Sequence, residues 1–302
     1  MPQDFLIMKL ELLRLMSKLR EVPLVRLERE LGLGGDSLSE IISQLKQNYL
    51  MKVSEGRLVW SDGDNPSTLS PWGWNYEYKV VVGSTMNIVK HMPPWSVVLT
   101  EYQVMGRGRK DKEWISNLGG IWLSFKIPVS QKAGELLPLI VPIILVRTIR
   151  DRLEKEVFIK WPNDIVVGDK KIAGILISGE AIGNTLTALI GIGINVNNEP
   201  PLPEALSLSS LVGKLIPRNR LLSHIIGLIG RIEKFVEKPE YLRLEYLDHL
   251  FTLGKKIEAQ TPRGIIRGVA KNVTETGELV VETDSGSVNL SWTEVNYLRH
   301  RE

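Results

Sequence analysis

The spacing of apolar residues changes twice along this 302-residue chain, and the changes divide it into units of different fold. Residues 1–62 begin with helical spacing, in which apolar residues recur three and four positions apart from Leu6 onward. They end in two short apolar runs around Glu55–Gly56, which is a hairpin signal. Three helices followed by a hairpin predict a winged helix-turn-helix domain. Residues 63–75 are rich in Ser, Gly, Asp, Asn and Pro, and we interpret them as a linker.

The rest of the chain predicts two further units. Residues 76–253 alternate strand and helix patterns, which is typical of an α+β domain with a mixed sheet and a helical layer. Residues 254–302 switch to short strands separated by turn residues, which predicts a small β-barrel. The fold class is therefore α+β, with a winged helix before the central domain and a β-domain after it.

Two helix boundaries can be predicted from local signals. Asp36 or Ser37 is expected to cap the third helix of the first unit, because short polar side chains accept hydrogen bonds from free N–H groups there. The apolar segment Leu136–Leu153 is expected to be a helix with Pro138 near its first turn.

Composition excludes several classes of function. The net charge of +3 does not indicate a nucleic-acid or membrane partner. The absence of cysteine excludes disulfides and thiolate chemistry, and the four histidines lack the spacing of zinc ligands. The most apolar stretch, Leu136–Val146, is shorter than the roughly 20 residues that cross a bilayer, and the N-terminus does not resemble a signal peptide. We therefore expect a cytoplasmic protein.

The most specific segment is the loop from Gln103 to Trp114, in which glycines alternate with arginines at Gly106–Arg109. Glycines let backbone N–H groups approach an anion, and arginines present a fixed fork of donors to phosphate or carboxylate. The alternative is a solvated basic loop. The alternation favours an anion-binding loop.

Three other segments place polar residues where chemistry could occur. In the segment 160–164, Pro162 fixes a turn between two strands and holds Lys160, Asn163 and Asp164 close together. The returning strand, Lys170–Leu176, would bring Lys171 near them, although a plain β-hairpin with a polar turn fits the spacing equally well. Gly191–Asn197 reads as a buried strand with close backbone approach, or as a strand packed tightly on a helix. Gly83–Asn87 follows a strand, and a helix cap would explain Ser84 or Thr85 without any ligand.

Taken in order, these segments resemble the biotin protein ligase family over about residues 76–299. The paired Gly-Arg-Gly-Arg loop, Lys-Trp-Pro-Asn-Asp turn and Lys-Ile-Ala-Gly-Ile-Leu strand carry the resemblance. It implies a class II synthetase-like central domain and an SH3-like C-terminal barrel. The N-terminal unit resembles the bifunctional subgroup, which also represses biotin genes. The resemblance further implies ATP with Mg²⁺, biotin as substrate, a biotin carboxyl carrier protein as acceptor and a homodimer.

The resemblance also assigns roles to residues. Ser84, Thr85 and Gln103 would bind the ureido ring of biotin, Gly106 and Arg107 would flank its tail, Trp114 would be an apolar neighbour, and Gly174 would let biotin lie against its strand. Lys171 would contact the biotin carboxylate and the α-phosphate. The nucleotide would be held by Arg107, Arg109, Lys160, Asn163, Lys171 and Asn195.

The chain departs from the family pattern at two places. Lys110-Asp111-Lys112 stands where the family loop usually continues Arg-Gly-Arg, so Asp111 weakens the positive field and retention of the intermediate. Met86 stands where many members have asparagine.

The implied chemistry suits these residue types. The biotin carboxylate is already ionised when it attacks the α-phosphate, so positioning and charge stabilisation by Lys171 and Arg109 would lower the barrier. The acceptor lysine must be neutral to attack the adenylate, and Asp164 is the candidate that orients it or accepts its proton. The alternative for Asp164 is a structural turn aspartate.

Other functions stay open at this point. A lipoate–protein ligase shares the fold and the adenylation chemistry but lacks the Lys-Trp-Pro-Asn-Asp signature, and an octanoyl transferase fits less well. A transcription regulator that uses biotinoyl-AMP as corepressor is a different class of function. The first 60 residues carry nine Lys/Arg against eight Asp/Glu, and phosphate contacts need cations, so DNA binding is permitted by the fold but not favoured by the charge.

Overall fold

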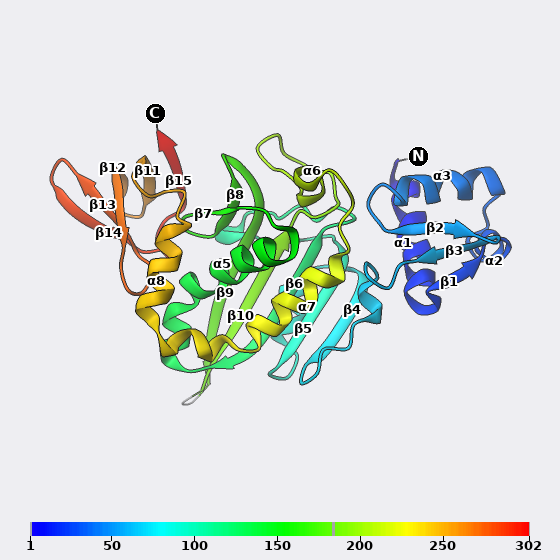
Figure 1. Ribbon diagram of the computed structural model, residues 1–302, viewed down its shortest axis with the longest axis horizontal. Coiled ribbons are helices and arrows are strands. Elements are labelled where there is room, and N and C mark those ends of the chain that lie inside the picture. Colours follow the sequence, from blue (N-terminus) through cyan, green and yellow to red (C-terminus); the bar gives the residue numbers. More distant parts are fainter. Residues whose placement is uncertain (1, 183–184, 302) are drawn as a thin grey trace.

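The computed structural model describes residues 2–182 and 185–301. Met1 and Glu302, which bound the expected terminal domains, lie outside the described residues. Figure 1 shows an elongated molecule with a helical unit at the N-terminal end, a large mixed sheet in the centre and a smaller β-sheet at the C-terminal end. The predicted α+β fold class, with its central mixed sheet, is confirmed.

The N-terminal module, residues 2–60, folds around an apolar core that includes Leu13, Leu27 and Trp60 and extends to Val80 of the central sheet. It contains a short strand, Glu21–Pro23, that the sequence analysis missed because three residues carry no periodicity. The predicted cap at Asp36 or Ser37 is wrong. Gly34 occupies the cap position and no side chain caps the helix, so Asp36 lies inside the first turn. The elements are α1 Pro2–Leu19, β1 Glu21–Pro23, α2 Leu24–Leu31, α3 Gly35–Leu45, β2 Met51–Ser54 and β3 Arg57–Trp60, with the strands in the order β1-β3-β2.

The central sheet has seven strands in the order β4-β5-β6-β10-β9-β8-β7. β4 and β5 are parallel and every other neighbouring pair is antiparallel. Apolar side chains dominate these strands because both faces of the sheet are covered. The strands are β4 Asn75–Val82, β5 Ser96–Gln103, β6 Ile121–Val129, β7 Phe158–Lys160, β8 Asp164–Val167, β9 Lys170–Ile182 and β10 Thr185–Ile194.

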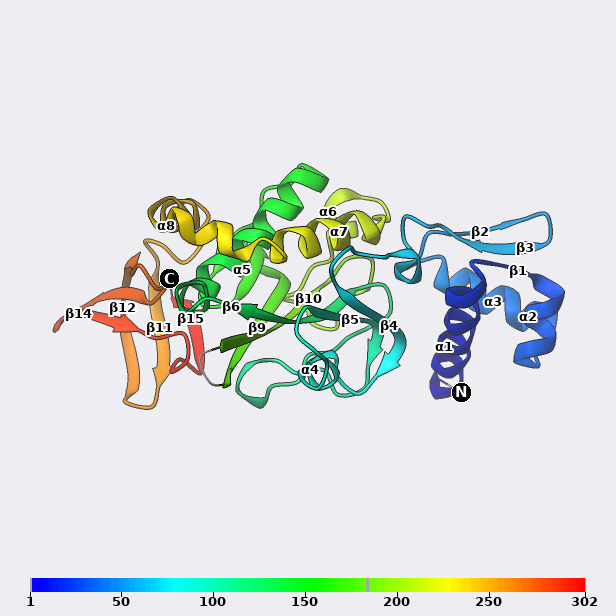
Figure 2. The same ribbon diagram turned by 90° about the horizontal axis from the view of Figure 1, so that it is seen from below.

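Helices cover the two faces of the central sheet unequally. Figure 2 shows α5, α7 and α8 on one face and the short α4 on the other. The long helix α5 begins at Gln131, earlier than predicted, because the Ser130 hydroxyl accepts a hydrogen bond from the N–H of Ala133 at 3.1 Å. Pro138 therefore lies inside the helix and not in its first turn. The helical segments are α4 Thr85–Lys90, η2 Arg109–Asp111, α5 Gln131–Leu153, α6 Leu208–Val212, α7 Arg218–Ile229, η3 Ile232–Glu237 and α8 Pro239–Asp248.

The C-terminal sheet shares a continuous apolar core with the central unit. The buried Trp161 indole donates a hydrogen bond to the carbonyl of Gly277 at 2.9 Å, which ties the β7–β8 turn to the C-terminal sheet. The shared core fixes this sheet beside the end of β7. The five antiparallel strands, in the order β14-β13-β12-β11-β15, are β11 Lys256–Thr261, β12 Gly264–Val273, β13 Leu279–Thr283, β14 Gly286–Leu290 and β15 Tyr297–Arg301.

The segment expected to be a linker is partly buried. Asp64 and Asn65 are fully buried, and η1, Pro66–Thr68, follows them, whereas Trp72 is 97% exposed. The segment is thus an anchored connection at its start, and it is anchored again near its end, where the Trp74 ring packs against Phe125. Within residues 2–182 and 185–301, no helix has the length and apolar character needed to span a membrane.

Candidate active site

A cavity of about 380 Å³ opens where the Gln103–Trp114 loop faces strands β9 and β10. Its volume lies in the range of small-ligand pockets. The cavity brings together side chains from segments that are far apart in the sequence. Among the predicted site residues, those that line it are Ser84, Thr85, Gln103, Arg107, Arg109, Trp114, Lys160, Asn163, Asp164, Lys171, Gly174 and Asn195.

Gly106 is the predicted site residue that does not line the cavity. It is buried behind the loop, where its carbonyl accepts a hydrogen bond from the N–H of Trp114 at 2.9 Å. A Cβ at this position would lie 2.2 Å from the carbonyl oxygen of Trp114. The lack of a side chain therefore lets the two arms of the loop approach each other and carries Trp114 into the cavity.

Two glycines form an apolar floor under the Trp114 indole. Gly174 on β9 pairs with Gly193 on β10. A Cβ on Gly174 would lie 2.6 Å from the indole ring, and a Cβ on Gly193 would lie 2.5 Å from it, so only glycine permits this packing. Gly193 lies in the glycine-containing strand that the sequence analysis singled out, although that analysis did not name it as a site residue. The indole packed on this floor gives the cavity a flat, apolar wall, and the part of the cavity beside it is called the slot below.

A neutral polar network closes one end of the slot. The N–H and hydroxyl of Thr85 donate to Gln103 Oε1 at 2.9 and 3.0 Å. Gln103 Nε2 donates to the hydroxyl of Ser116 at 2.8 Å, which holds the amide in place. The buried Ser84 hydroxyl has no hydrogen-bond partner among the described residues. A buried polar group without a partner costs free energy, so this end favours a neutral ligand that hydrogen-bonds to Ser84.

Cations gather at the other end. Lys171 Nζ lies 2.8 Å from Asp164 Oδ1 and 4.8 Å from the centre of the Trp114 ring. These contacts hold the ammonium between the aromatic slot and the carboxylate. An anionic group that reached this end of the slot would meet the Lys171 ammonium directly.

Arg109 is already held by the protein in this structure. Its guanidinium donates to Asn163 Oδ1 at 3.1 Å, to the carbonyl of Val295 at 3.2 Å and to the carbonyl of Trp292. Burial lowers the pKa of Arg109, and the nearby Asp164 carboxylate opposes that effect. Lys110 donates to the carbonyl of Thr293 at 2.7 Å. The basic loop is therefore tied to the C-terminal sheet and is not a freely solvated run of charge.

The structure adds lining residues that the sequence analysis missed. Asn296, Tyr297 and Leu298 come from the C-terminal sheet, and Leu202 and Ala205 come from the loop after β10. The backbone of Lys171 exchanges hydrogen bonds with Glu204 and Leu206, which places this loop beside the cavity. No spacing signal could have found these residues, because they meet the other lining residues only through tertiary folding.

Two protein-family models match parts of this chain. Residues 80–195 match the model of the "Biotin/lipoate A/B protein ligase family", and residues 252–294 match the "Biotin protein ligase C terminal domain". The chain belongs to the biotin protein ligase family. The resemblance inferred from the sequence is thereby confirmed.

Known relatives are similar to this chain over most of its length. The bifunctional ligase/repressor BirA of Bacillus subtilis is 28% identical over 266 residues, which cover 82% of this chain and 81% of that protein. The biotin–[acetyl-CoA-carboxylase] ligase of Mycobacterium tuberculosis is 29% identical over 220 residues, which cover 67% of this chain and 79% of that protein. Among solved structures, the biotin protein ligase of Aquifex aeolicus in complex with biotin and ATP is 27% identical with a TM-score of 0.65, covering 75% of this chain and 99% of that one.

Proposed function

We infer that this chain is an ATP-dependent biotin protein ligase, which forms biotinoyl-5′-AMP and transfers biotin to a lysine of a biotin carboxyl carrier protein. One observation carries the inference. A single cavity joins a neutral hydrogen-bonding end, an apolar slot and a cationic end. That order matches a ligand with a neutral urea-like ring, an aliphatic tail and a carboxylate.

The polar end suits the ureido ring. The Ser84 hydroxyl has no hydrogen-bond partner among the described residues, so it is free to bind a ligand. The Thr85–Gln103 pair is held in place by the hydrogen bond from Gln103 to Ser116. The thiophane ring and tail would lie in the cavity beside the Trp114 indole, with Arg107 at its edge. The tail would then carry the carboxylate to Lys171.

Adenylation would be carried out by positioning and charge. The carboxylate oxygen attacks the α-phosphorus, and the bond to the pyrophosphate leaving group breaks. Lys171 would stabilise the charge on the α-phosphate, and Arg109 would join it once phosphate replaces the carbonyl partners of its guanidinium. Lys160, Asn163 and Asn195 would hold the rest of the nucleotide.

Transfer would need a neutral acceptor amine. Asp164 lies beside Lys171 at the mouth of the same cavity, where it could orient the incoming lysine or accept its proton. The amine attacks the acyl carbon, an amide forms and AMP leaves. The adenylate would be the shared intermediate of both steps.

Magnesium fits this site as a companion of the nucleotide. Mg²⁺ keeps several waters and binds substrate phosphates with one or two carboxylates, so it does not need a protein cage. Asp164 and the amide oxygens of Asn163 and Asn195 are the oxygen donors that this chain could add. The ion would neutralise phosphate charge during adenylation.

The domain organisation and partners are part of the same proposal. We place a winged helix at residues 1–62, a connecting segment at 63–75, the catalytic domain at 76–253 and the C-terminal domain at 254–302. The helix–strand–helix–helix–strand–strand order of the N-terminal module supports the winged helix. A homodimer and a cytoplasmic location are expected from the resemblance to the bifunctional subgroup.

Substrate-dependent exchange of labelled pyrophosphate into ATP tests the proposed function. Biotin should support exchange, and lipoate should not. Exchange with lipoate but not with biotin would contradict the assignment and favour a lipoate–protein ligase.

A further inference from the structure

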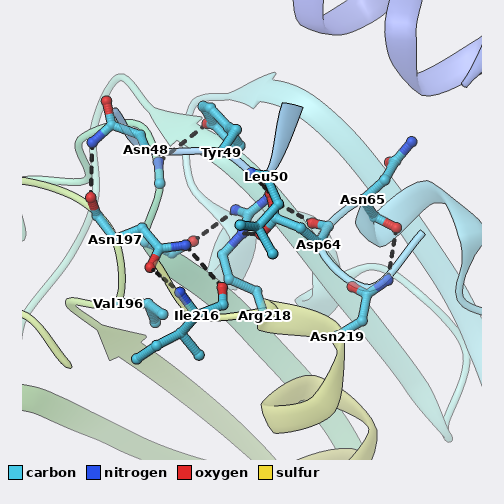
Figure 3. Close-up of polar contacts among 12 residues, drawn as sticks. Asn48, Tyr49, Leu50, Asp64, Asn65, Val196, Asn197, Ile216, Arg218 and Asn219 are labelled. Carbon is cyan, nitrogen blue, oxygen red and sulfur yellow. Dashed lines mark hydrogen bonds and ion pairs between the residues drawn. The ribbon is translucent and has the colours of Figure 1, made fainter. Parts of the chain in front are cut away.

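The N-terminal module is joined to the catalytic domain by a closed ring of hydrogen bonds, of which Figure 3 shows the contact between Asn48 and Asn197. Asn48 Nδ2 donates to the carbonyl of Asn197 at 2.8 Å, and the N–H of Asn197 donates to the carbonyl of Gly119 at 3.0 Å. The N–H of Gly119 then donates to the hydroxyl of Tyr49 at 3.1 Å. Because Asn48 and Tyr49 are neighbours in the chain, these contacts form a closed ring. We call it the junction ring, and its members are Asn48, Tyr49, Gly119 and Asn197.

The two catalytic-side members of the ring stand directly behind the active site. Gly119 follows the basic loop by a few residues, and Asn197 lies two residues beyond Asn195, which lines the cavity. The backbone at Gly119 has φ +97°, and a Cβ there would lie 2.8 Å from Asn48 Cβ and 3.1 Å from the N–H nitrogen of Asn198. The segment that follows the basic loop is therefore pressed between the N-terminal module and the segment that follows β10.

The ring also bears on the side chain that faces the nucleotide. Asn198 Nδ2 donates to Asn195 Oδ1 at 2.9 Å and so sets the orientation of the Asn195 amide. The side chain of Asn197 exchanges two hydrogen bonds of 2.9 Å with the backbone of Ile216. A displacement of the ring would thus be transmitted to Asn195 through adjoining backbone.

A buried ionic cluster anchors the module side of the ring. The Arg218 guanidinium, which is 1% exposed, pairs with Asp64 at 2.8 Å and with Glu101 at 2.6 Å. Tyr49 donates its hydroxyl proton to Glu101 at 2.9 Å, and Arg218 stacks over the Tyr49 ring with 4.8 Å between its Cζ and the ring centre. Burial would lower the pKa of Arg218, but the two carboxylates raise it above its usual value, so the guanidinium stays charged. Burial and then Glu101 raise the pKa of Tyr49, so its hydroxyl stays protonated.

The same cluster fixes the connecting segment and the loop. Asp64 accepts hydrogen bonds from the N–H of Leu50 and the indole of Trp60, both at 3.0 Å. Arg218 donates to the carbonyl of Gly120 at 3.1 Å. The module meets this cluster through hydrogen bonds that Tyr49, Leu50 and Trp60 donate to the buried carboxylates. Rotating the module away would leave those carboxylates without these donors, which costs free energy. The module is therefore a rigid support for the end of the loop.

We propose that Asn48 and Tyr49 are positioning residues for the ligase reaction: through the junction ring, the N-terminal module holds the basic loop and Asn195 in the arrangement that binds biotin and ATP. The proposal rests on the proposed function. If only a fraction of molecules holds the loop correctly, the apparent dissociation constant rises by the inverse of that fraction. Coupling is reciprocal, so bound ligands should also stabilise the ring.

Asn48→Ala in the full-length chain is the test, because Asn48 is only partly buried and its side chain makes a single hydrogen bond to the catalytic side. We expect the KM for biotin and for ATP in pyrophosphate exchange to rise about three- to tenfold, the range that loss of one hydrogen bond gives, while kcat changes less than about twofold. Asn48→Asp, which turns an acceptor toward the Asn197 carbonyl, should raise KM further. Gln44→Ala is the control, since the Gln44 amide donates its hydrogen bond within its own helix, to Glu40; it should leave both constants unchanged.

Hydrogen exchange separates positioning from general destabilisation. In Asn48→Ala, amides of residues 103–120 and 195–198 should exchange faster, while those of the core strand β6 keep their protection. In the wild type, biotin with ATP should slow exchange at residues 48–50, and Asn48→Ala should lose this effect. Wild-type KM values with unchanged loop protection would overturn the proposal, and so would uniform loss of protection along the chain. Absence of biotin-dependent pyrophosphate exchange in the wild type would instead reject the proposed function. Hydrogen exchange of the loop without ligands would still report on the junction ring in that case.

Discussion

Lys171 is the side chain on which the proposed chemistry depends most. It lies in the cavity between Asp164 and Trp114 and is about one-third exposed, so it contributes little to packing. We expect Lys171→Ala to lower the rate of adenylate formation by about two to three orders of magnitude, because loss of one charge-stabilising group costs roughly 2.7–4 kcal/mol in the transition state. Single-turnover formation of biotinoyl-AMP measures this.

The neighbouring Lys170 is the matched control for Lys171, since it is exposed and lies outside the cavity. Lys170→Ala should keep the wild-type rate. Equal rates in the two variants would show that the assignment of Lys171 is wrong.

His300 is expected to make the free energy of unfolding depend on pH, and replacing this one side chain isolates the effect. Burial, followed by the charges of Lys160 and Lys255, lowers its pKa to about 4, and Asp169 opposes this weakly. Because the folded pKa is below the unfolded value, the unfolded chain binds the proton first as pH falls. The contribution of neutral His300 to stability is therefore complete above about pH 6.5 and is lost progressively as pH falls toward 4.

Urea unfolding at pH 7.5 and pH 5 checks the His300 prediction. The wild type should lose more stability between the two values than His300→Phe, which keeps a ring beside Phe251 but cannot titrate. Equal losses in the two proteins would show that His300 does not carry this dependence.

At the scale of elements, the pairing of β9 with β10 decides the shape of the slot. Gly193→Ala would place a Cβ 2.5 Å from the Trp114 indole, and a rigid ring cannot absorb that overlap without moving. We expect biotin affinity to fall about tenfold or more, since overpacking of this kind costs roughly 1–3 kcal/mol. Isothermal titration with biotin measures the change.

Gly179→Ala on β9 is the control for this substitution, because its nearest contact would be an ordinary 3.6 Å to Leu186. Biotin affinity should stay at the wild-type value there. If both alanine variants bind biotin equally well, the glycine floor does not shape the slot.

Most elements of this fold could be predicted from the sequence, since long apolar periods specify strands and helices locally. The errors came at boundaries. α5 begins at the Ser130 cap, whereas the prediction placed its start close to Pro138. α3 begins after Gly34, whereas the prediction placed its cap at Asp36 or Ser37. The three-residue strand β1 is defined only by its pairing with β3.

The residues of the candidate site also divide into those that could be predicted from the sequence and those that could not. Residues within glycine-rich or charged motifs could be named in advance, because their local pattern is unusual. Asn296 to Leu298 could not, since they reach the cavity only when the C-terminal sheet packs beside β7. The junction ring was equally hidden, because an asparagine and a tyrosine before a strand are ordinary in sequence.

At the scale of the whole molecule, the charge of the N-terminal module argues against tight DNA binding. The cations on α3 and the following hairpin are Lys46, Lys52 and Arg57, and Arg57 already pairs with Glu21. Asp36, Glu40 and Glu55 are exposed among them. Log affinity for DNA falls with log salt by about 0.9 per phosphate contacted, so a few contacts give weak binding at about 150 mM salt. Selection from random duplexes with biotin and ATP present should recover no tightly bound site. One palindromic sequence bound at nanomolar concentration would contradict this and make the enzyme a repressor.

Transfer of biotin to a protein is tested most directly by the mass of an acceptor. A biotin carboxyl carrier domain would be incubated with the full-length chain, biotin and MgATP, and its mass measured before and after. We predict the addition of one biotinoyl group to a single lysine, dependent on ATP and abolished when that lysine is replaced by arginine. An unchanged mass, or addition of a lipoyl group when lipoate is offered in place of biotin, would contradict the account.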